Sequence, residues 1–427
     1  MRAIGRWSLA ALMVNSIIGS GIFGLPSVLA GFVGAASPLV MLLGGVCTGV
    51  IMACFAEVAS QFTSTGGPYL YARVTFGRFV GIQMGWMLWL AQLTAPAANA
   101  NLFVLYLGEF WPHAKQTIPR FLILSLLVWG LAAVNLRGVR AGARVSNVLT
   151  AAKLLPLVVI IGVGTVFLLS RGRALSLPFL AVGAVSWMEV MLRAVFAYGG
   201  FETALTPMAE ARNPRRDAAF AVFTALLTCT VVYTLVQWVA VGTVPDLAHS
   251  ERPLADAARA LMGRAGAGLI TVGALVSFYG YLSAKVLAVP RITFALAERG
   301  DFPSFFAAVH PRFRTPYVSI LIFALLTWLL ALAGSFAWNL TLSSVARLFY
   351  YGVTCAALPV LRRKQPGAAL FRLPAGPVFA VIGVIICAVL VTRVDRSGFL
   401  ILLVTITLAA LNWLWARNRP GTVPKSL

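Results

Sequence analysis

One stretch near the N-terminus combines residues that could bind a charged ligand within an otherwise apolar helix. Residues 15–27 read Asn-Ser-Ile-Ile-Gly-Ser-Gly-Ile-Phe-Gly-Leu-Pro-Ser, so three glycines and a proline interrupt the apolar run over 7–32. Backbone groups freed at bilayer depth are tolerated where they line a cavity or bind a ligand. We expect a second half-helix to begin with the bare amides of Ser20, Gly21 and Ile22, whose positive dipole end suits a carboxylate. A simple kink is the alternative, because glycine and proline are common in transmembrane helices.

A second interrupted segment lies far along the chain. Residues 196–202 read Phe-Ala-Tyr-Gly-Gly-Phe-Glu within an apolar run from Trp187 to Met208. Two interrupted helices in corresponding places are the best sequence indication of a transporter binding site. The pair therefore favours a small-molecule site built from both interruptions.

The chain as a whole is typical of a polytopic helical membrane protein. Its 427 residues are 60% hydrophobic and 11% charged, the mean hydropathy is +0.89, and apolar runs too long for a soluble core recur. We predict an all-α fold that forms a single transmembrane domain over 1–427. The connection from Pro245 to Arg264 could carry a short helix. Twelve transmembrane helices are expected at roughly 7–32, 37–60, 77–107, 119–136, 145–170, 186–208, 218–244, 265–298, 317–334, 337–361, 375–393 and 398–416.

The interrupted helices are the first and sixth of these, and each opens a group of five. An odd number of helices per group turns the second group upside down relative to the first, which is the inverted-repeat plan. We expect the first repeat over 1–170, the second over 186–361, and two additional helices over 375–416.

The formal net charge of +22 follows membrane topology. We assign about 21 of the 34 Lys and Arg residues to one set of alternating loops and tails, the excess typical of the cytoplasmic side. Both termini are therefore expected in the cytoplasm, in a multi-pass protein of the cell membrane. The charge is spread over short loops, which indicates contact with the lipid bilayer and no nucleic acid partner. No cleavable signal peptide is expected, because the first apolar run contains the interruption.

Other kinds of chemistry find little support in the sequence. The five cysteines lie in apolar helices without paired spacing, and the three histidines lie in isolated loops. Neither pattern predicts a disulfide or a metal site. No nucleophile, base and acid converge in the sequence, so we expect neither an enzyme nor a bound cofactor.

The order and spacing of several motifs resemble one family. The chain is similar to an amino acid permease of the amino acid, polyamine and organocation superfamily, which has the LeuT-type inverted-repeat fold. The resemblance extends from the first helix to about Arg363. Its motifs are Gly19-Ser20-Gly21-Ile22-Phe23, Gly66-Gly67-Pro68-Tyr69-Leu70-Tyr71 with Phe76-Gly77, Lys153, Phe196 to Glu202 with Glu210 and Asn213-Pro214, Pro290-Arg291, Gly300-Asp301-Phe302-Pro303, and Thr315-Pro316.

The resemblance implies a site for an α-amino acid zwitterion. The substrate carboxylate would bind the three amides at the first interruption, and the ammonium would bind carbonyls of Ile17, Phe196 and Gly199. This division agrees with the helix dipole, because half-helix N-termini suit anions and C-terminal ends suit cations. Phe196 also resembles the family's aromatic gate over the substrate. Packing against lipid or core is the alternative for one Phe among 27.

Lys153 is an ionisable residue about eight positions into the fifth helix, hence about 12 Å along it. Such a group is costly at bilayer depth. The alternative is that the Lys153 side chain snorkels to the cytoplasmic interface. In proton-coupled members of the family, a lysine at the matching place stands where sodium-dependent transporters of this fold bind a cation. Burial disfavours the charged ammonium. The resemblance therefore implies that Lys153 loads and releases the coupled proton.

Three acidic residues have structural or gating roles in this interpretation. Glu202 resembles the family's acidic residue at the sixth helix. It could carry a proton, pair with a lysine or stabilise the unwound backbone, and the last role is favoured. Glu57 and Glu210 lie near the inner face, beside arginine-rich loops. They could form an inner gate, but surface ion pairs of little energetic value are the favoured interpretation.

Two basic residues depart from the family pattern or lack an obvious partner. Lys285 stands where relatives place a neutral polar or aromatic residue close to the substrate's side chain. If it faces the cavity, it should disfavour arginine, lysine and polyamines and could attract an acidic side chain. It could instead pair with Glu202. Arg347, midway along the tenth helix, has no acidic neighbour in sequence, so a partner on another helix is expected.

These observations predict a proton-coupled symporter that imports a small neutral amino acid by alternating access. An amino acid exchanger is the alternative, since its sequence could look identical. A sensor derived from the same fold, which binds an amino acid without moving it, also fits the residues.

Overall fold

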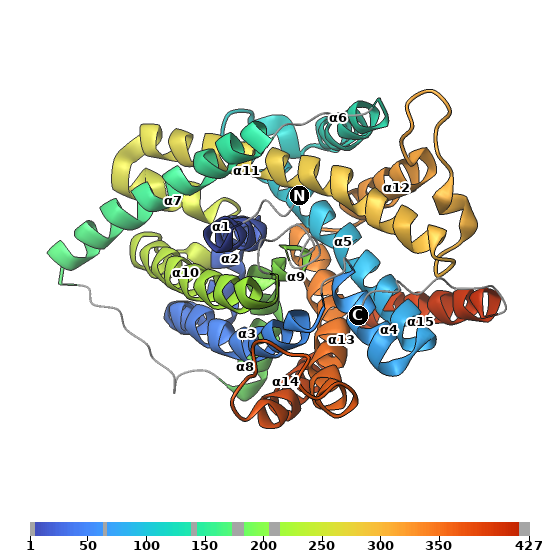
Figure 1. Cartoon of the computed structure of the whole chain (residues 1–427). Coiled ribbons are helices and arrows are strands. Elements are labelled where there is room, and N and C mark those ends of the chain that lie inside the picture. The colour runs from blue at the N-terminus through green and yellow to red at the C-terminus, as the bar shows by residue number, and fades with distance from the viewer. Residues whose placement is uncertain (1–4, 63–65, 138–142, 173–182, 205–213, 418–427) are drawn as a thin grey trace.

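The computed structural model describes all residues except 1–4, 63–65, 138–142, 173–182, 205–213 and 418–427. The described residues form helices and connections and contain no strand (Figure 1). The helices are α1 (Arg6–Ile17), α2 (Gly21–Val33), α3 (Ser37–Ser60), α4 (Gly67–Phe76), α5 (Arg78–Leu107), α6 (Thr117–Leu136), α7 (Ala143–Ser170), α8 (Ala184–Tyr198), α9 (Phe201–Ala204), α10 (Pro214–Thr243), α11 (Pro253–Glu298), α12 (Tyr317–Ala333), α13 (Phe336–Lys364), α14 (Gly376–Val391) and α15 (Arg396–Ala416).

The all-helical class agrees with the prediction, and the helices lie in the expected ranges with two differences. We expected no helix between Gly66 and Gly77, whereas α4 occupies this stretch and follows Gly66, which has φ 154°. Helix α11 begins at Pro253, within the long connection, and kinks at Gly263 with φ 68°. By length and composition, six described segments could cross a membrane, namely Gly21–Ser60, Thr117–Leu136, Ala219–Thr243, Pro253–Glu298, Phe336–Lys364 and Arg396–Ala416. Twelve spans and an inverted repeat stay predictions.

The two interrupted helices occupy the centre of the molecule. Figure 1 shows α1, α2 and α9 surrounded by the longer helices α5, α10, α11 and α13. Helix α10 packs on α1 and α3, α11 packs on α5 and α7, and α13 packs on α5 and α14. Close approach of α2 to its neighbours depends on Gly24, because a Cβ there would lie 2.6 Å from the ring of Phe336 and 2.8 Å from Leu102. The interruptions are therefore enclosed by protein.

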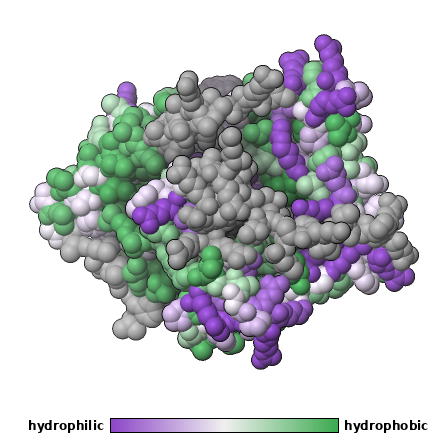
Figure 2. Space-filling model, in the orientation of Figure 1, coloured by the Kyte–Doolittle hydropathy of each residue, from purple (hydrophilic) through white to green (hydrophobic). Residues whose placement is uncertain are grey.

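The outer surface carries large apolar side chains, as expected for a protein in contact with lipid. Figure 2 shows a broad hydrophobic area on the left of the view, over α7 and α10. The exposed apolar residues of these two helices include Leu155, Val158, Val166, Leu169, Phe223, Leu227 and Val231.

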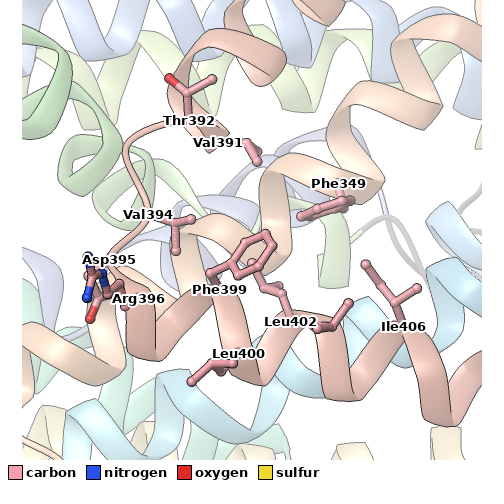
Figure 3. A pocket seen from close by; sticks show the side chains of 11 residues that line it. Phe349, Val391, Thr392, Val394, Asp395, Arg396, Phe399, Leu400, Leu402 and Ile406 are labelled. Carbon is pink, nitrogen blue, oxygen red and sulfur yellow. The ribbon is translucent and has the colours of Figure 1, made fainter.

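A hollow of about 600 Å³ lies where α13 meets α15 and the end of α14 (Figure 3). Its lining is mostly apolar and includes Phe349, Phe399 and Leu402. None of the residues at the interruptions belongs to this lining. The polar residues of the lining, Thr392, Asp395 and Arg396, lie outside both interrupted helices, so we place the candidate site elsewhere.

A buried aspartate ties four parts of the chain together. Asp301 follows α11, is fully buried, and accepts hydrogen bonds from Tyr69 and Arg73 of α4. Arg78 of α5 donates from Nε to its other carboxylate oxygen at 2.8 Å. Asn412 of α15 donates to its backbone carbonyl at 2.7 Å. Because both carboxylate oxygens are paired, Asp301 fixes the position of α4 relative to the longer helices.

Replacing Asp301 by asparagine should destabilise the protein strongly. The Asp301→Asn variant leaves Arg73 buried without a counter-ion, and breaking a buried pair in this way costs about 3–5 kcal/mol. Thermal unfolding in detergent measures the loss. The control is Glu251→Gln, whose pair with Lys115 is half exposed and is worth about 1 kcal/mol at most. Equal stability of the two variants would contradict the importance of the Asp301 pairs.

Candidate binding site at the two interrupted helices

The first interruption separates α1 from α2 at the residues that the sequence singles out. Helix α1 ends at Ile17, and Ile18 leaves the helical conformation with ψ 92°. Ser20 precedes α2, and its side chain makes no capping hydrogen bond. The amides of Gly21 and Ile22 therefore open a new helix without a side-chain cap. A helix N-terminus lies where the sequence predicts an anion seat, and anion binding there stays a prediction.

The second interruption separates α8 from α9. Helix α8 ends at Tyr198, Gly199 is extended, and α9 begins at Phe201. Gly200 has φ 117°, a conformation that favours glycine. A Cβ on Gly200 would collide with the backbone carbonyl oxygen of Ser16, and the Ser16 hydroxyl donates to the Gly200 carbonyl at 2.8 Å. The two interruptions are thus in direct contact.

Tyr233 of α10 joins the ends of both interrupted helices. Its buried hydroxyl lies 3.0 Å from the carbonyl oxygen of Ile17 and 3.0 Å from that of Ala197. Both carbonyls lie at C-terminal ends of half-helices, where no amide of the next turn is available. Sequence reasoning missed Tyr233, because one tyrosine in an apolar helix has no distinguishing pattern.

Phe196 faces the first interruption. Its side chain is buried and packs edge-to-face against Phe336, with ring centroids 6.2 Å apart. A Cβ on Gly21 would lie 3.5 Å from the Phe196 ring, so the ring lies against the start of α2. Packing against lipid is therefore wrong for this residue. Its carbonyl accepts from the Gly199 amide at 3.3 Å, which leaves one lone pair for a ligand.

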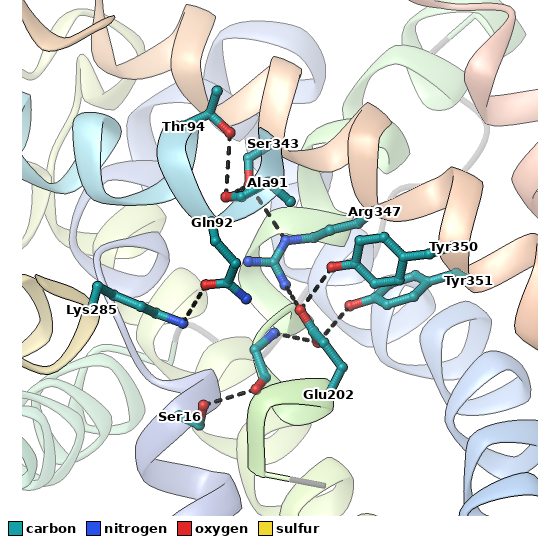
Figure 4. Close-up of polar contacts among 11 residues, drawn as sticks. Ser16, Ala91, Gln92, Thr94, Glu202, Lys285, Ser343, Arg347, Tyr350 and Tyr351 are labelled. Atoms are coloured by element: carbon teal, nitrogen blue, oxygen red, sulfur yellow. Dashed lines mark hydrogen bonds and ion pairs between the residues drawn. The ribbon is translucent and has the colours of Figure 1, made fainter. Parts of the chain in front are cut away.

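Glu202 is the centre of a buried polar network beside the second interruption (Figure 4). Arg347 of α13 donates from Nη1 to Oε1 at 2.5 Å, and Tyr350 donates to the same oxygen at 2.8 Å. Tyr351 and the Gly200 amide donate to Oε2 at 3.0 and 2.9 Å. The carboxylate stabilises the unwound backbone, which is the role favoured from the sequence. Arg347 has the expected partner on another helix.

Lys285 of α11 does not pair with Glu202, so that alternative is wrong. Its ammonium donates to Gln92 Oε1 at 2.7 Å and lies 5.2 Å from the centroid of the Tyr281 ring. The Tyr281 ring lies 3.6 Å from where a Cβ on Gly19 would stand. The Tyr281 ring is therefore a neighbour of both Lys285 and the first interruption.

Glu57 forms a buried pair, so the surface ion pair expected for it is wrong. Its carboxylate is fully buried and accepts two hydrogen bonds of 2.6 Å from Arg362, one on each oxygen. The Leu373 amide also donates to it at 2.8 Å.

Glu210 lies outside the described residues. Lys153 lies within α7, but its side chain is not among those described.

Comparison with known proteins gives a consistent result. The profile of the family described as "Amino acid permease" matches residues 4–413. The chain is 28% identical over 411 residues to the methylthioribose transporter of Bacillus subtilis, covering 90% of this chain and 87% of the relative. It is 27% identical over 423 residues to the serine/threonine exchanger of the same organism, covering 94% of both. It is 28% identical over 409 residues to the arginine/agmatine antiporter of Chlamydia pneumoniae, covering 90% and 83%.

Contact between the interruptions predicts a sharp effect at Gly200. The Gly200→Ala variant places a methyl group against the Ser16 carbonyl and strains a residue at positive φ, so ligand binding should be lost or the protein should unfold at lower temperature. Gly172→Ala is the control, because Gly172 also has positive φ but no atom lies within 4 Å of its Cβ position. Thermal unfolding and ligand binding compare the two. Equal behaviour would mean that contact with Ser16 does not matter.

The network at Glu202 predicts non-additive effects on stability. Glu202→Gln leaves the Arg347 guanidinium buried without its counter-ion, at a cost of about 3–5 kcal/mol. The double variant Glu202→Gln and Arg347→Gln removes both charges and should recover part of that loss. Unfolding of the single and double variants measures the coupling. A double variant as unstable as the sum of the singles would contradict a direct pair.

Proposed function

Because the chain belongs to the amino acid permease family, of the amino acid, polyamine and organocation superfamily, we propose that it imports a small neutral amino acid together with a proton. Import follows alternating access across the cell membrane, with both termini in the cytoplasm. The observation that carries the proposal is the direct contact of two interrupted helices, which presents free amides of α2 beside carbonyls of α1 and α8.

The two interruptions together offer a partner for each charge of a zwitterion. The substrate carboxylate binds the amides of Ser20, Gly21 and Ile22, because the N-terminus of α2 carries the positive end of its dipole. The substrate ammonium binds carbonyl oxygens of Ile17, Phe196 and Gly199 at the ends of α1 and α8. Phe196 covers the seat of the carboxylate and excludes water, because its ring lies against the start of α2.

The side chain of the substrate carries no positive charge in this proposal. Lys285 and Arg347 are both buried near the interruptions, whereas Glu202 already accepts from Arg347. A cationic side chain would meet an unbalanced ammonium in a medium of low dielectric constant. The relatives' names range from serine and threonine to methylthioribose and arginine, so membership of the family does not itself name the substrate.

Proton coupling is assigned to Lys153 of α7. Its position within an apolar helix favours a lysine that loses its proton during each cycle.

Exchange of one amino acid for another is the second candidate function, and relatives named as an exchanger and as antiporters support it. Exchange requires an internal amino acid and ignores an imposed pH difference.

Lys153→Gln should abolish uptake driven by a pH gradient, because a neutral amide cannot carry the proton. Proteoliposomes with an acidic exterior and a panel of labelled amino acids measure the uptake. Lys115→Gln is the control, because Lys115 lies in an exposed connection and pairs with Glu251. Unchanged pH dependence in a folded variant that binds substrate would remove Lys153 from the mechanism. Uptake by the natural protein that needs internal amino acid and ignores pH would favour exchange.

A further inference from the structure

Lys285 is a buried cation whose partner in the structure is neutral. Its side chain is 7% exposed, and its ammonium donates to the Gln92 side-chain oxygen at 2.7 Å. Of the described residues, none places a carboxylate within ion-pair distance of it. A charged ammonium without a counter-ion is costly inside a membrane protein, and such residues line substrate or ion pathways.

The carboxylate that interacts electrostatically with Lys285 is already paired. Glu202 accepts from Arg347, Tyr350 and Tyr351 and from the backbone, so the Arg347 charge is balanced. Lys285 interacts electrostatically with both Arg347 and Glu202. This group of two cations and one carboxylate therefore has an excess positive charge, located at Lys285.

Gln92 adds hydrogen-bond donors that have no acceptor. The residue is 2% exposed, and its Nε2 atom has no partner among the described residues. Its Oε1 atom is held by Lys285, which leaves the amide hydrogens of Nε2 available. A buried donor without an acceptor costs about 1–3 kcal/mol. Two neighbouring side chains, from α5 and α11, thus offer donors for which the described part of the chain supplies no further acceptor.

The position of this pair links it to the proposed substrate site. The Tyr281 ring contacts both the Lys285 ammonium and Gly19, which precedes the N-terminus of α2. Figure 4 shows Lys285 and Gln92 meeting to the left of Arg347 and Glu202, with Ser16 of the first interruption below them. A substrate whose backbone binds the interruptions would extend its side chain toward these donors.

We propose that Lys285 and Gln92 form a side-chain subsite that binds a carboxylate, so that acidic amino acids are accepted in addition to small neutral ones. The inference rests on the proposed amino acid transport and specifies its substrate class. The ammonium balances the charge of the side-chain carboxylate, and Nε2 of Gln92 donates to its second oxygen. Aspartate or glutamate therefore binds more tightly than asparagine or glutamine, which have the same shape without the charge.

Binding to the purified full-length protein in detergent tests the subsite. Isothermal titration measures Kd for aspartate, asparagine, glutamate, glutamine and alanine. The natural protein should bind the better acidic amino acid about 10- to 100-fold more tightly than its amide, the effect of a hydrogen bond to a charged group. Lys285→Met should bring this ratio to about one. Gln92→Glu should do the same, because it supplies Lys285 with an internal carboxylate.

Two controls retain the ratio of the natural protein. Lys115→Met removes an exposed lysine, and Gln83→Leu removes another buried glutamine of α5, whose side chain donates to the Ile406 carbonyl. If Lys285→Met fails to fold, Gln92→Glu still decides the result.

Three outcomes overturn the subsite while the amino acid site stands. The first is a natural protein that binds alanine but neither acidic amino acid. The second is an unchanged acid-to-amide ratio in both Lys285→Met and Gln92→Glu. The third is an equal loss for acid and amide, which would mean that Lys285 binds the α-carboxylate. A protein that binds none of the five amino acids overturns the proposed function itself.

Discussion

Backbone groups released inside a membrane need partners, and this constraint shapes the centre of the molecule. Hydrocarbon offers no hydrogen bonds, so the carbonyls and amides freed at the two interruptions must be satisfied by protein or ligand. The single Tyr233 O–H lies within hydrogen-bond distance of one carbonyl from each interrupted helix. The Ser16 hydroxyl donates to the Gly200 carbonyl, and the Glu202 carboxylate accepts from the Gly200 amide. Among the described residues, no side chain caps the amides at the start of α2. The proposed binding site is therefore the part of the backbone whose amides a substrate carboxylate would satisfy.

The same constraint applies to charge. Asp301, Glu57 and Glu202 are fully buried, and each is paired with an arginine from a different helix. Replacing a buried pair by apolar residues is often neutral for stability, so such pairs favour a particular arrangement of helices more than they add to its stability. Lys285 differs, because its partner is a neutral amide. In the proposed subsite, the carboxylate of a bound substrate would supply the missing negative charge.

Predictions from the sequence were most accurate where a local rule applied. Glycine and proline within a long apolar run interrupt the helix, and the structure has interruptions after Ile17 and after Tyr198. The length of each apolar run similarly located the helices. Partners far apart in sequence were not accessible in this way. Glu202 and Arg347 are 145 residues apart, and Glu57 and Arg362 are 305 apart. The expected surface pair at Glu57 was wrong because burial depends on helices that pack over it.

The sequence by itself determined the class of protein, the places where two helices unwind and the residues whose amides begin α2. These features follow from backbone propensities and from hydropathy, which act over a few neighbouring residues. Only the tertiary structure decided that Arg347 forms an ion pair with Glu202 and that Lys285 donates a hydrogen bond to Gln92. It also decided that Tyr233 lies against both interruptions. Those choices depend on which faces of α5, α10, α11 and α13 turn toward one another. Side-chain contacts between helices distant in sequence carry no local signal.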